Sequence, residues 1–168
     1  PNGFLPLDEP LVTHEVIELL PTQKKAIREM EEQMVAWLDD NPMIADIPLT
    51  KAARIRQLTL AVPTITYDAE DNAEVTFNVD CKSPHLDRLV DYLTGDFSDE
   101  PVLVFTDSQK FAAVVTERLN EAGISAFEFS GKTRGTRDAQ AAEFGSKYRV
   151  MVGVLAAVAE GYDGAQRV

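Results

Sequence analysis

The residues best suited to chemistry near the C-terminus follow a run of apolar sequence. That run ends at Leu155, and Glu160-Gly161-Tyr162-Asp163-Gly164 comes shortly after it. The segment combines flexible backbone with carboxylates, and a carboxylate accepts hydrogen bonds from the hydroxyl groups of a ribose. Since parallel sheets bind ligands beyond the carboxyl ends of their strands, this position favours a ligand site. An ordinary turn with two glycines is the alternative.

A second candidate is a basic stretch within an acidic chain. The 168 residues carry a formal net charge of −12, which opposes the approach of a polyanion at long range. Residues 132–149 nevertheless hold five basic and two acidic side chains. The bases are Lys132, Arg134, Arg137, Lys147 and Arg149. Such a cluster can neutralise nucleic-acid phosphates, although a solvated face explains the same charges equally well.

Other patterns resemble catalytic motifs, and their spacing argues against them. Gly131-Lys132-Thr133 is similar to the end of a phosphate-binding loop, which needs a glycine five positions earlier, where Ala126 stands. Ser83, His85 and Asp87 are the residue types of a hydrolase triad, but they lie two apart on one expected helix and cannot converge. One cysteine and two histidines are too few for a usual zinc site, so no metal site is predicted.

The elements that must position these residues divide into two parts near residue 80. In the second part, three apolar runs alternate with three helical patterns. The runs lie at 102–105, 125–129 and 149–155, and the helical patterns at 84–93, 108–122 and 136–144. Strands separated by helices of this length are typical of a parallel sheet. We therefore predict an α/β fold for residues 81–168.

The first part, residues 1–80, is predicted to be a helical linker region. Thr22 is expected to cap a helix that runs to about Asp40, and Thr50 a second helix that ends before Pro63. An apolar stripe at helical spacing supports the first helix; it comprises Ile27, Met30, Met34, Trp37 and Leu38. Residues 64–80 alternate like a hairpin or a single short strand.

Composition also predicts the compartment. A single cysteine, Cys81, excludes an intramolecular disulfide and favours a reducing, cytoplasmic location. No apolar window reaches the ~18 residues of a membrane span, and the N-terminus does not read as a signal peptide. The start at Pro1 indicates a fragment of a longer protein.

The order of several short segments resembles the second RecA-like lobe, with the preceding inter-lobe helical segment, of Swi2/Snf2-type superfamily 2 helicases. The resemblance runs from about Leu19 to Val168. Its pieces are Leu19-Leu20-Pro21-Thr22-Gln23, Leu49 to Gln57, Lys82 to Leu86, Pro101 to Thr106 (motif IV), Ser130-Gly131 with Arg137 and Phe144, and Glu160 to Asp163 (motif V).

This resemblance implies a function for the intact protein: a DNA-dependent ATPase that translocates along DNA or remodels it. Gly161 and Asp163 would contact the ATP ribose. Thr106, Lys132, Arg134 and Arg137 would lie on the nucleic-acid track, with double-stranded DNA as the expected partner. The first RecA-like lobe, with its phosphate loop and Asp-Glu box, and motif VI are absent from residues 1–168. Neither ATP nor Mg²⁺ is therefore expected to be fully bound by this chain, which we predict to be inactive alone.

Two alternatives stay open. Asp163 stands where Swi2/Snf2 proteins usually carry Asn, and this variant is similar to the "G-x-D" of other superfamily 2 motors, such as RNA helicases and restriction-enzyme motors. The segment from Leu49 to Gln57 argues for the Swi2/Snf2 branch. The other alternative is a non-catalytic α/β module that binds a partner through its acidic N-terminal helix.

Overall fold

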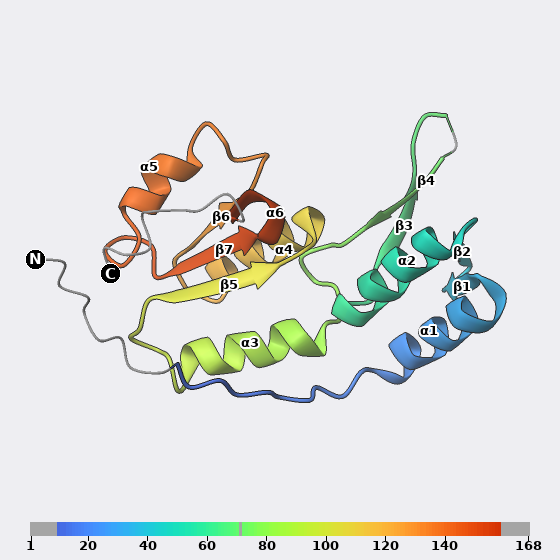
Figure 1. Ribbon diagram of the computed structural model, residues 1–168, viewed down its shortest axis with the longest axis horizontal. Helices are drawn as coiled ribbons and strands as arrows, with labels where there is room; N and C mark the ends of the chain where they lie inside the picture. Colours follow the sequence, from blue (N-terminus) through green and yellow to red (C-terminus); the bar gives the residue numbers. More distant parts are fainter. Residues whose placement is uncertain (1–9, 71, 159–168) are drawn as a thin grey trace, which may run out of the picture.

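The fold is built around a parallel sheet in the second half of the chain and two antiparallel hairpins in the first half (Figure 1). The computed structural model describes residues 10–70 and 72–158. Among these, no helix has the length and apolar character that crossing a bilayer requires. The predicted α/β class with a parallel sheet flanked by helices is confirmed for the second half.

The parallel sheet has three strands in the order β5-β7-β6. They are β5 (Val102–Thr106), β6 (Ala126–Phe129) and β7 (Val150–Val154). Phe105 and Phe129 both lie beside Gly153 in the register, on opposite sides of the central strand. All five residues of β7 are buried, as expected for a strand covered on both faces.

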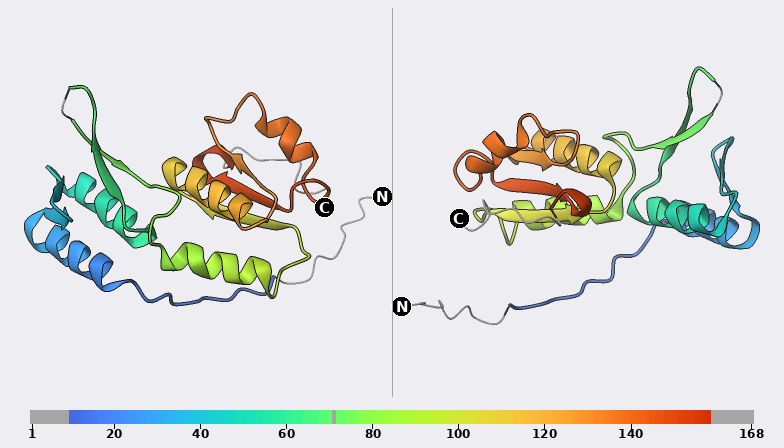
Figure 2. Two further views of the ribbon diagram at one scale, coloured as in Figure 1. Left: turned by 180° about the vertical axis from the view of Figure 1, so that it is seen from behind. Right: turned by 45° about the horizontal axis from the view of Figure 1, so that its top comes forward.

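Helices cover both faces of this sheet (Figures 1 and 2). One face packs against α3 (Pro84–Thr94) and α4 (Gln109–Glu121), which contribute Leu86, Leu93, Phe111 and Leu119 to the main core. The other face carries a smaller core under α5 (Arg137–Ala142) and α6 (Leu155–Val158). Its buried residues are Phe127, Phe129, Ala141 and Met151.

Serine caps start the two long helices beside the sheet. The Ser83 hydroxyl accepts a hydrogen bond from Leu86 N (3.1 Å), and the Ser108 hydroxyl accepts one from Phe111 N (3.2 Å). Ser83 also donates to Leu60 O at 2.6 Å, which fastens the start of α3 to the end of the preceding helix. Gly123 follows the end of α4 with a φ of +78°, the left-handed conformation that favours glycine.

The first half differs from the predicted helical linker. The expected helix to Asp40 ends instead at Gln33 in α1 (Pro21–Gln33), because Met34 adopts a left-handed φ of 59°. A hairpin follows, formed by β1 (Val35–Leu38) and β2 (Asn41–Ile44). Asp39, with a φ of 53°, starts the two-residue turn between them. Trp37 and Leu38 therefore belong to a strand, and the predicted helical stripe is wrong beyond Met34.

Both predicted threonine caps are also wrong, because proline begins each helix a little earlier. Leu20 is the N-cap of α1 and Ile47 that of α2 (Pro48–Leu60). The buried Gln23 side chain takes over the capping of α1: its Oε1 accepts from Leu20 N at 3.1 Å. Its Nε2 donates to Leu58 O at 2.7 Å, which joins the start of α1 to the end of α2.

The second hairpin and an extended N-terminal segment complete the first half. Of the two alternatives predicted for residues 64–80, a hairpin or a single short strand, the structure has the hairpin, formed by β3 (Thr64–Tyr67) and β4 (Ala73–Thr76). Residues 10–20, here called the strap, run along α3 before α1 begins (Figure 1). Glu15 holds the strap there by accepting hydrogen bonds from Arg88 Nε (2.8 Å) and the Tyr92 hydroxyl (2.7 Å).

Candidate functional site

The candidate site is a hollow of about 430 Å³ at the carboxyl edge of the parallel sheet. All three strands end there, so side chains from loops far apart in the sequence meet. The lining residues are Asp107, Gln109, Gly131, Arg134, Arg137, Val154, Ala156 and Ala157. This is the edge at which open parallel sheets bind ligands.

A buried serine organises the loop that follows β6. Ser130 is fully buried, and its hydroxyl is hydrogen-bonded to the Glu128 carboxylate and accepts from Lys132 N at 3.2 Å. Thr133 closes the same loop: its hydroxyl accepts from Ser130 N (3.1 Å) and donates to Glu128 O (2.9 Å). Residues 130–133 thus form a hydrogen-bonded turn, which fixes where the chain leads to Arg134 and Arg137.

Arg137 is the most firmly held cation of the site. Its guanidinium carbon lies 4.7 Å from the centre of the Phe129 ring, and its Nη1 donates to Ser130 O at 3.2 Å. Its Nε lies 3.6 Å from Asp138 Oδ1 and is buried without a hydrogen bond. With only 18% of its side chain exposed, Arg137 is preorganised rather than freely solvated.

Two exposed bases precede Arg137. Arg134 lines the hollow, whereas Lys132 is exposed on the same loop and does not line it. Within the part of the chain that the structure describes, neither forms an ion pair. Their charges are thus available to an anionic ligand. The structure brings Arg134 and Arg137 together and leaves Lys132 at the rim.

Thr106 ends β5 on the other side of the hollow. Its hydroxyl accepts a hydrogen bond from Ser108 N at 3.2 Å, so it is already used at the start of α4. The next residue, Asp107, lines the hollow and forms an ion pair with Arg56 of α2 at 3.5 Å. This pair links the first half of the chain to the sheet edge. Its partners are 75% and 47% exposed, so it contributes little to stability by itself.

Asp107 and Gln109 are site residues that the sequence interpretation did not include. Gln109 Nε2 donates to the Ser130 hydroxyl at 3.4 Å, which connects the start of α4 to the loop after β6. Asp107 could have been found from its place just after a predicted strand, and Gln109 from its place at the start of the predicted helix that follows. The Arg56 contact has no such signal, because the two residues lie far apart in the sequence.

The predicted ATP-contact residues, Gly161 and Asp163, lie outside the described residues. The last described element, α6, begins directly after β7 at the edge of the hollow, and Ala156 and Ala157 of this helix line it. The structure also shows why Gly131-Lys132-Thr133 is not the end of a phosphate-binding loop. Ala126 is buried at the start of β6, and α5 begins at Arg137 rather than at Lys132.

A neighbouring hollow of about 390 Å³ is mainly apolar. It lies between α3, β5 and the start of α4, and is lined among others by His85, Leu89, Phe105 and Phe111. Burial lowers the pKa of His85, and its Nδ1 has no hydrogen-bond partner. Asp87, by contrast, pairs with Arg118 at 2.5 Å. Ser83 and Asp87 therefore bond to different neighbours, and the three side chains do not form a triad, as their spacing predicts.

The chemistry that the 430 Å³ hollow supports is anion binding. It combines two arginines and an amide with the Asp107 carboxylate, whose charge is paired with Arg56. No protein-family model matches the chain, and a search of curated proteins finds no match. The functional assignment therefore depends on the site geometry and on the order of the sequence segments.

Proposed function

We propose that residues 81–168 form the second RecA-like lobe of an ATP-driven DNA translocase of the Swi2/Snf2 type, preceded by its inter-lobe segment. The main supporting observation is the convergence at the sheet edge. Arg134 and Arg137, which follow β6, line the same hollow as Asp107, which follows Thr106. The segment containing Gly161 and Asp163 comes a few residues after β7 and its short helix.

Nucleic acid would bind through phosphate contacts at this edge. Lys132, Arg134 and Arg137 would provide the cations, and Thr106 would contact the nucleic acid from the end of β5. The turn after β6 holds Arg137 through Ser130 O. Because the whole chain has a net charge of −12, binding to this lobe alone is expected to be weak. In the intact protein the first lobe would provide the other contacts.

ATP would bind between the two lobes of the intact protein. Gly161 and Asp163 would orient the ribose, because a carboxylate accepts hydrogen bonds from its hydroxyls. The phosphate cradle and the Mg²⁺ ligands would come from the first lobe. ATP hydrolysis would supply the free energy for lobe closure, and Arg134 and Arg137 would hold the DNA backbone during that movement.

The two alternative functions differ in the ligand that they predict at this edge of the sheet. In another superfamily 2 motor, RNA or DNA would occupy the same basic loop, and Asp163 favours this branch. In a non-catalytic α/β module the loop would be a solvated surface with no ligand. Charge reversal at the loop separates this module from both motors.

The experiment compares Lys132→Glu/Arg134→Glu with Lys147→Glu in the intact protein that contains this chain. Lys132 and Arg134 form no ion pair among the described residues, so their reversal should leave the fold unchanged. Lys147 precedes β7 at the opposite edge of the sheet and pairs with Glu143 at 3.1 Å. Its reversal therefore places a negative charge away from the site and also shows what the loss of an ion pair alone does. We expect the double variant to lose DNA-stimulated ATPase activity by about tenfold, which corresponds to ~1.4 kcal/mol.

Basal ATPase activity, measured without DNA, should stay within about twofold of the parent in both variants. The slope of log Kd against log salt should fall by about 0.9 for each phosphate contact removed. Equal DNA stimulation in the parent and the double variant would contradict the proposal and favour the non-catalytic module. Stimulation by RNA but not by duplex DNA would favour the other superfamily 2 branch.

A further inference from the structure

The Asp107 carboxylate lies among the groups that otherwise suit the 430 Å³ hollow to anions. It lines that hollow together with Arg134 and Arg137, and it also lines the neighbouring apolar hollow of about 390 Å³. A carboxylate beside a bound anion repels it, and this repulsion weakens binding unless a cation offsets the charge. The charge of Asp107 is therefore the least favourable feature of the hollow for the ligand proposed above.

Arg56 of α2 supplies the compensating charge. Its Nη1 lies 3.5 Å from Asp107 Oδ2, and among residues 10–70 and 72–158 neither side chain has another ion pair. Arg56 is not one of the residues that line the hollow, so it acts on an anion there chiefly through Asp107. Because both side chains are exposed, loss of the pair should change the local charge without unfolding the chain.

Arg56 reaches Asp107 because the end of α2 contacts the second half of the chain. Leu60, four residues after Arg56, lies on the same face of the helix and lines the apolar hollow. The Leu60 side chain packs against the main core, and its carbonyl accepts the hydrogen bond from the Ser83 hydroxyl. The ion pair thus lies beside the contacts that join α2 to the sheet and its helices.

α2 is held within the first half by a side chain of α1. Gln23 Nε2 donates to Leu58 O at 2.7 Å and to Thr59 O at 3.2 Å. Leu58 is also fully buried in the core that α1, α2 and both hairpins share. The place of Arg56 is therefore set by the packing of the first half.

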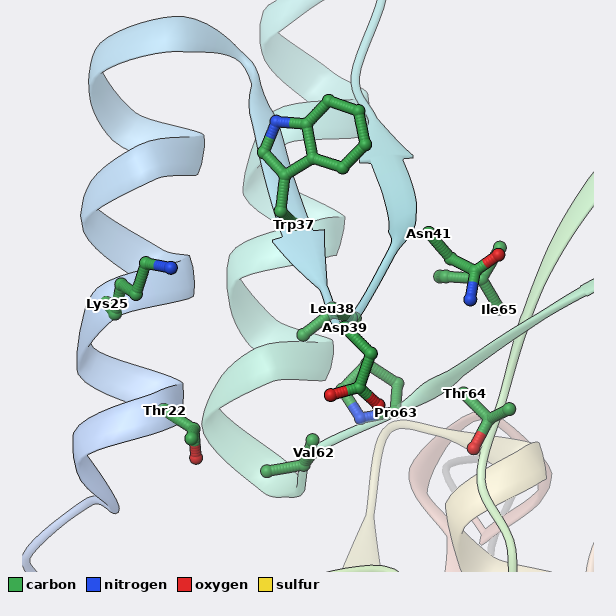
Figure 3. Close-up of a pocket in the computed structure, with 10 residues that line it drawn as sticks. All are labelled: Thr22, Lys25, Trp37, Leu38, Asp39, Asn41, Val62, Pro63, Thr64 and Ile65. Carbon is green, nitrogen blue, oxygen red and sulfur yellow. The ribbon is translucent and has the colours of Figure 1, made fainter.

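The surroundings of the end of α2 support the same conclusion (Figure 3). Val62 and Pro63, which follow the helix, line a hollow of about 290 Å³ together with Thr22 of α1 and Asp39 of the β1–β2 turn. Thr64, the first residue of β3, borders the same hollow. Elements from the whole first half thus meet at the end of α2, so this helix belongs to a packed unit.

We propose that Arg56 is a positioning residue for the anion site at the sheet edge. It holds the Asp107 carboxylate in an ion pair and offsets its charge, so that Arg134 and Arg137 attract a phosphate unopposed. The anion affinity of the sheet edge therefore depends on contact with α2. This inference rests on the anion binding that the proposed function assigns to the hollow, and it adds a means by which the first half of the chain controls that binding.

The test measures the binding of inorganic pyrophosphate to the 168-residue chain by NMR titration at low salt. The side-chain Nε–H signals of Arg134 and Arg137 are followed, because both residues line the hollow. Arg56→Gln should raise the Kd for pyrophosphate about fivefold, since it leaves the Asp107 charge uncompensated. Arg56→Lys, which keeps the positive charge, should stay within about twofold of the parent.

A double-mutant cycle separates this positioning role from direct attraction of the anion by Arg56. Asp107→Asn should bind pyrophosphate at least as tightly as the parent, because it removes the repelling charge. In that background, Arg56→Gln should change the Kd by less than about twofold. Lys24→Gln is the matched control: it breaks the ion pair with Glu18 (2.7 Å), removes the same charge from the chain and should bind like the parent.

An unchanged Kd in Arg56→Gln would overturn the inference. An equal loss of affinity in the parent and Asp107→Asn backgrounds would do the same, because Arg56 would then act on the anion directly. Pyrophosphate that leaves the Arg134 and Arg137 signals unchanged would overturn the anion site together with this inference. The translocase proposal fails separately, since unaltered DNA stimulation after charge reversal at Lys132 and Arg134 would contradict it whatever the outcome of this cycle.

Discussion

Arg137 and Phe129 are joined by a cation–π contact of 4.7 Å between the guanidinium carbon and the ring centre. This contact fastens the first residue of α5 to the last residue of β6. The six-residue helix is too short to be stable from its own hydrogen bonds. Its position, and with it the basic loop of the candidate site, depends on Arg137 and on the small core beneath it.

The first prediction concerns this contact. Arg137→Gln should lower the free energy of unfolding by about 1–2 kcal/mol, because it removes the contact with Phe129 and the hydrogen bond to Ser130 O. Urea denaturation followed by circular dichroism measures this change. Arg134→Gln is the control and should stay within about 0.5 kcal/mol of the parent, since its side chain is exposed. Equal stability of the two variants would show that the contact has no energetic role.

The second prediction concerns the close packing of the central strand. A Cβ atom on Gly153 would lie 3.0 Å from the Phe105 ring and 3.0 Å from Val158 Cγ2. Gly153→Ala should therefore destabilise the fold by about 1–2 kcal/mol through overpacking. Phe105→Leu should relieve part of this strain, so the two substitutions should not add in a double-mutant cycle of urea midpoints. Additive effects would place the strain elsewhere.

The third prediction concerns the thiol of Cys81. Burial raises its pKa, and the charge of Arg118 offsets only part of that effect. Because a raised pKa leaves less thiolate at a given pH, the folded chain should react with a disulfide reagent at pH 8 at least about tenfold more slowly than the urea-unfolded chain. The folded rate should keep rising with pH above the ordinary thiol pKa of about 8.5.

The raised pKa of Cys81 also makes the free energy of unfolding depend on pH. The protonated thiol is favoured in the folded state, so its contribution is present below the ordinary thiol pKa and is lost as the pH rises through the raised value. The Cys81→Ser variant should not react with the disulfide reagent, folded or unfolded, and serves as the blank. Equal rates for folded and unfolded Cys81 would mean that the thiol is accessible in solution.

The fourth prediction is that the isolated chain does not hydrolyse ATP. The Thr133 hydroxyl, which would bind Mg²⁺ in a phosphate loop, donates instead to Glu128 O at 2.9 Å. Lys132 is exposed and has no glycine-rich loop before it. Release of phosphate from Mg-ATP by the purified chain should match a no-protein blank, and Lys132→Ala should not change it. Turnover abolished by Lys132→Ala would revive the phosphate-loop interpretation.

Much of the parallel sheet could be predicted from sequence because its signals are local. The predicted strand at 102–105 corresponds to β5, and the predicted helix at 108–122 contains α4. Continuous apolar runs identify buried strands, and serine caps identify helix starts. The convergence of Asp107, Gln109 and Arg134 around one hollow was partly predictable, since all three follow predicted strands.

The first half could not be predicted from the same signals. Met30, Met34 and Trp37 fit a helical stripe, but the alternation of buried Ala36 with exposed Trp37 fits a strand equally well. Tertiary contacts decide between the two structures. Ala36 and Met43 are buried against α1 and α2, and this burial favours the hairpin over a longer helix. The hydrogen bonds of Gln23 to α2 likewise depend on the folded arrangement and leave no local trace in the sequence.

The strap makes α3 the first point at which a mechanical load can enter the folded chain. Tension applied to the segment ahead of residue 10 reaches Glu15 before it reaches α1, so Arg88 and Tyr92 bear it first. These contacts lie on the opposite side of α3 from the sheet, whose core includes Leu86 and Leu93 of the same helix. A pull on the N-terminal side would thus be transmitted to the parallel sheet as a displacement of one rigid helix, with the two hairpins bypassed.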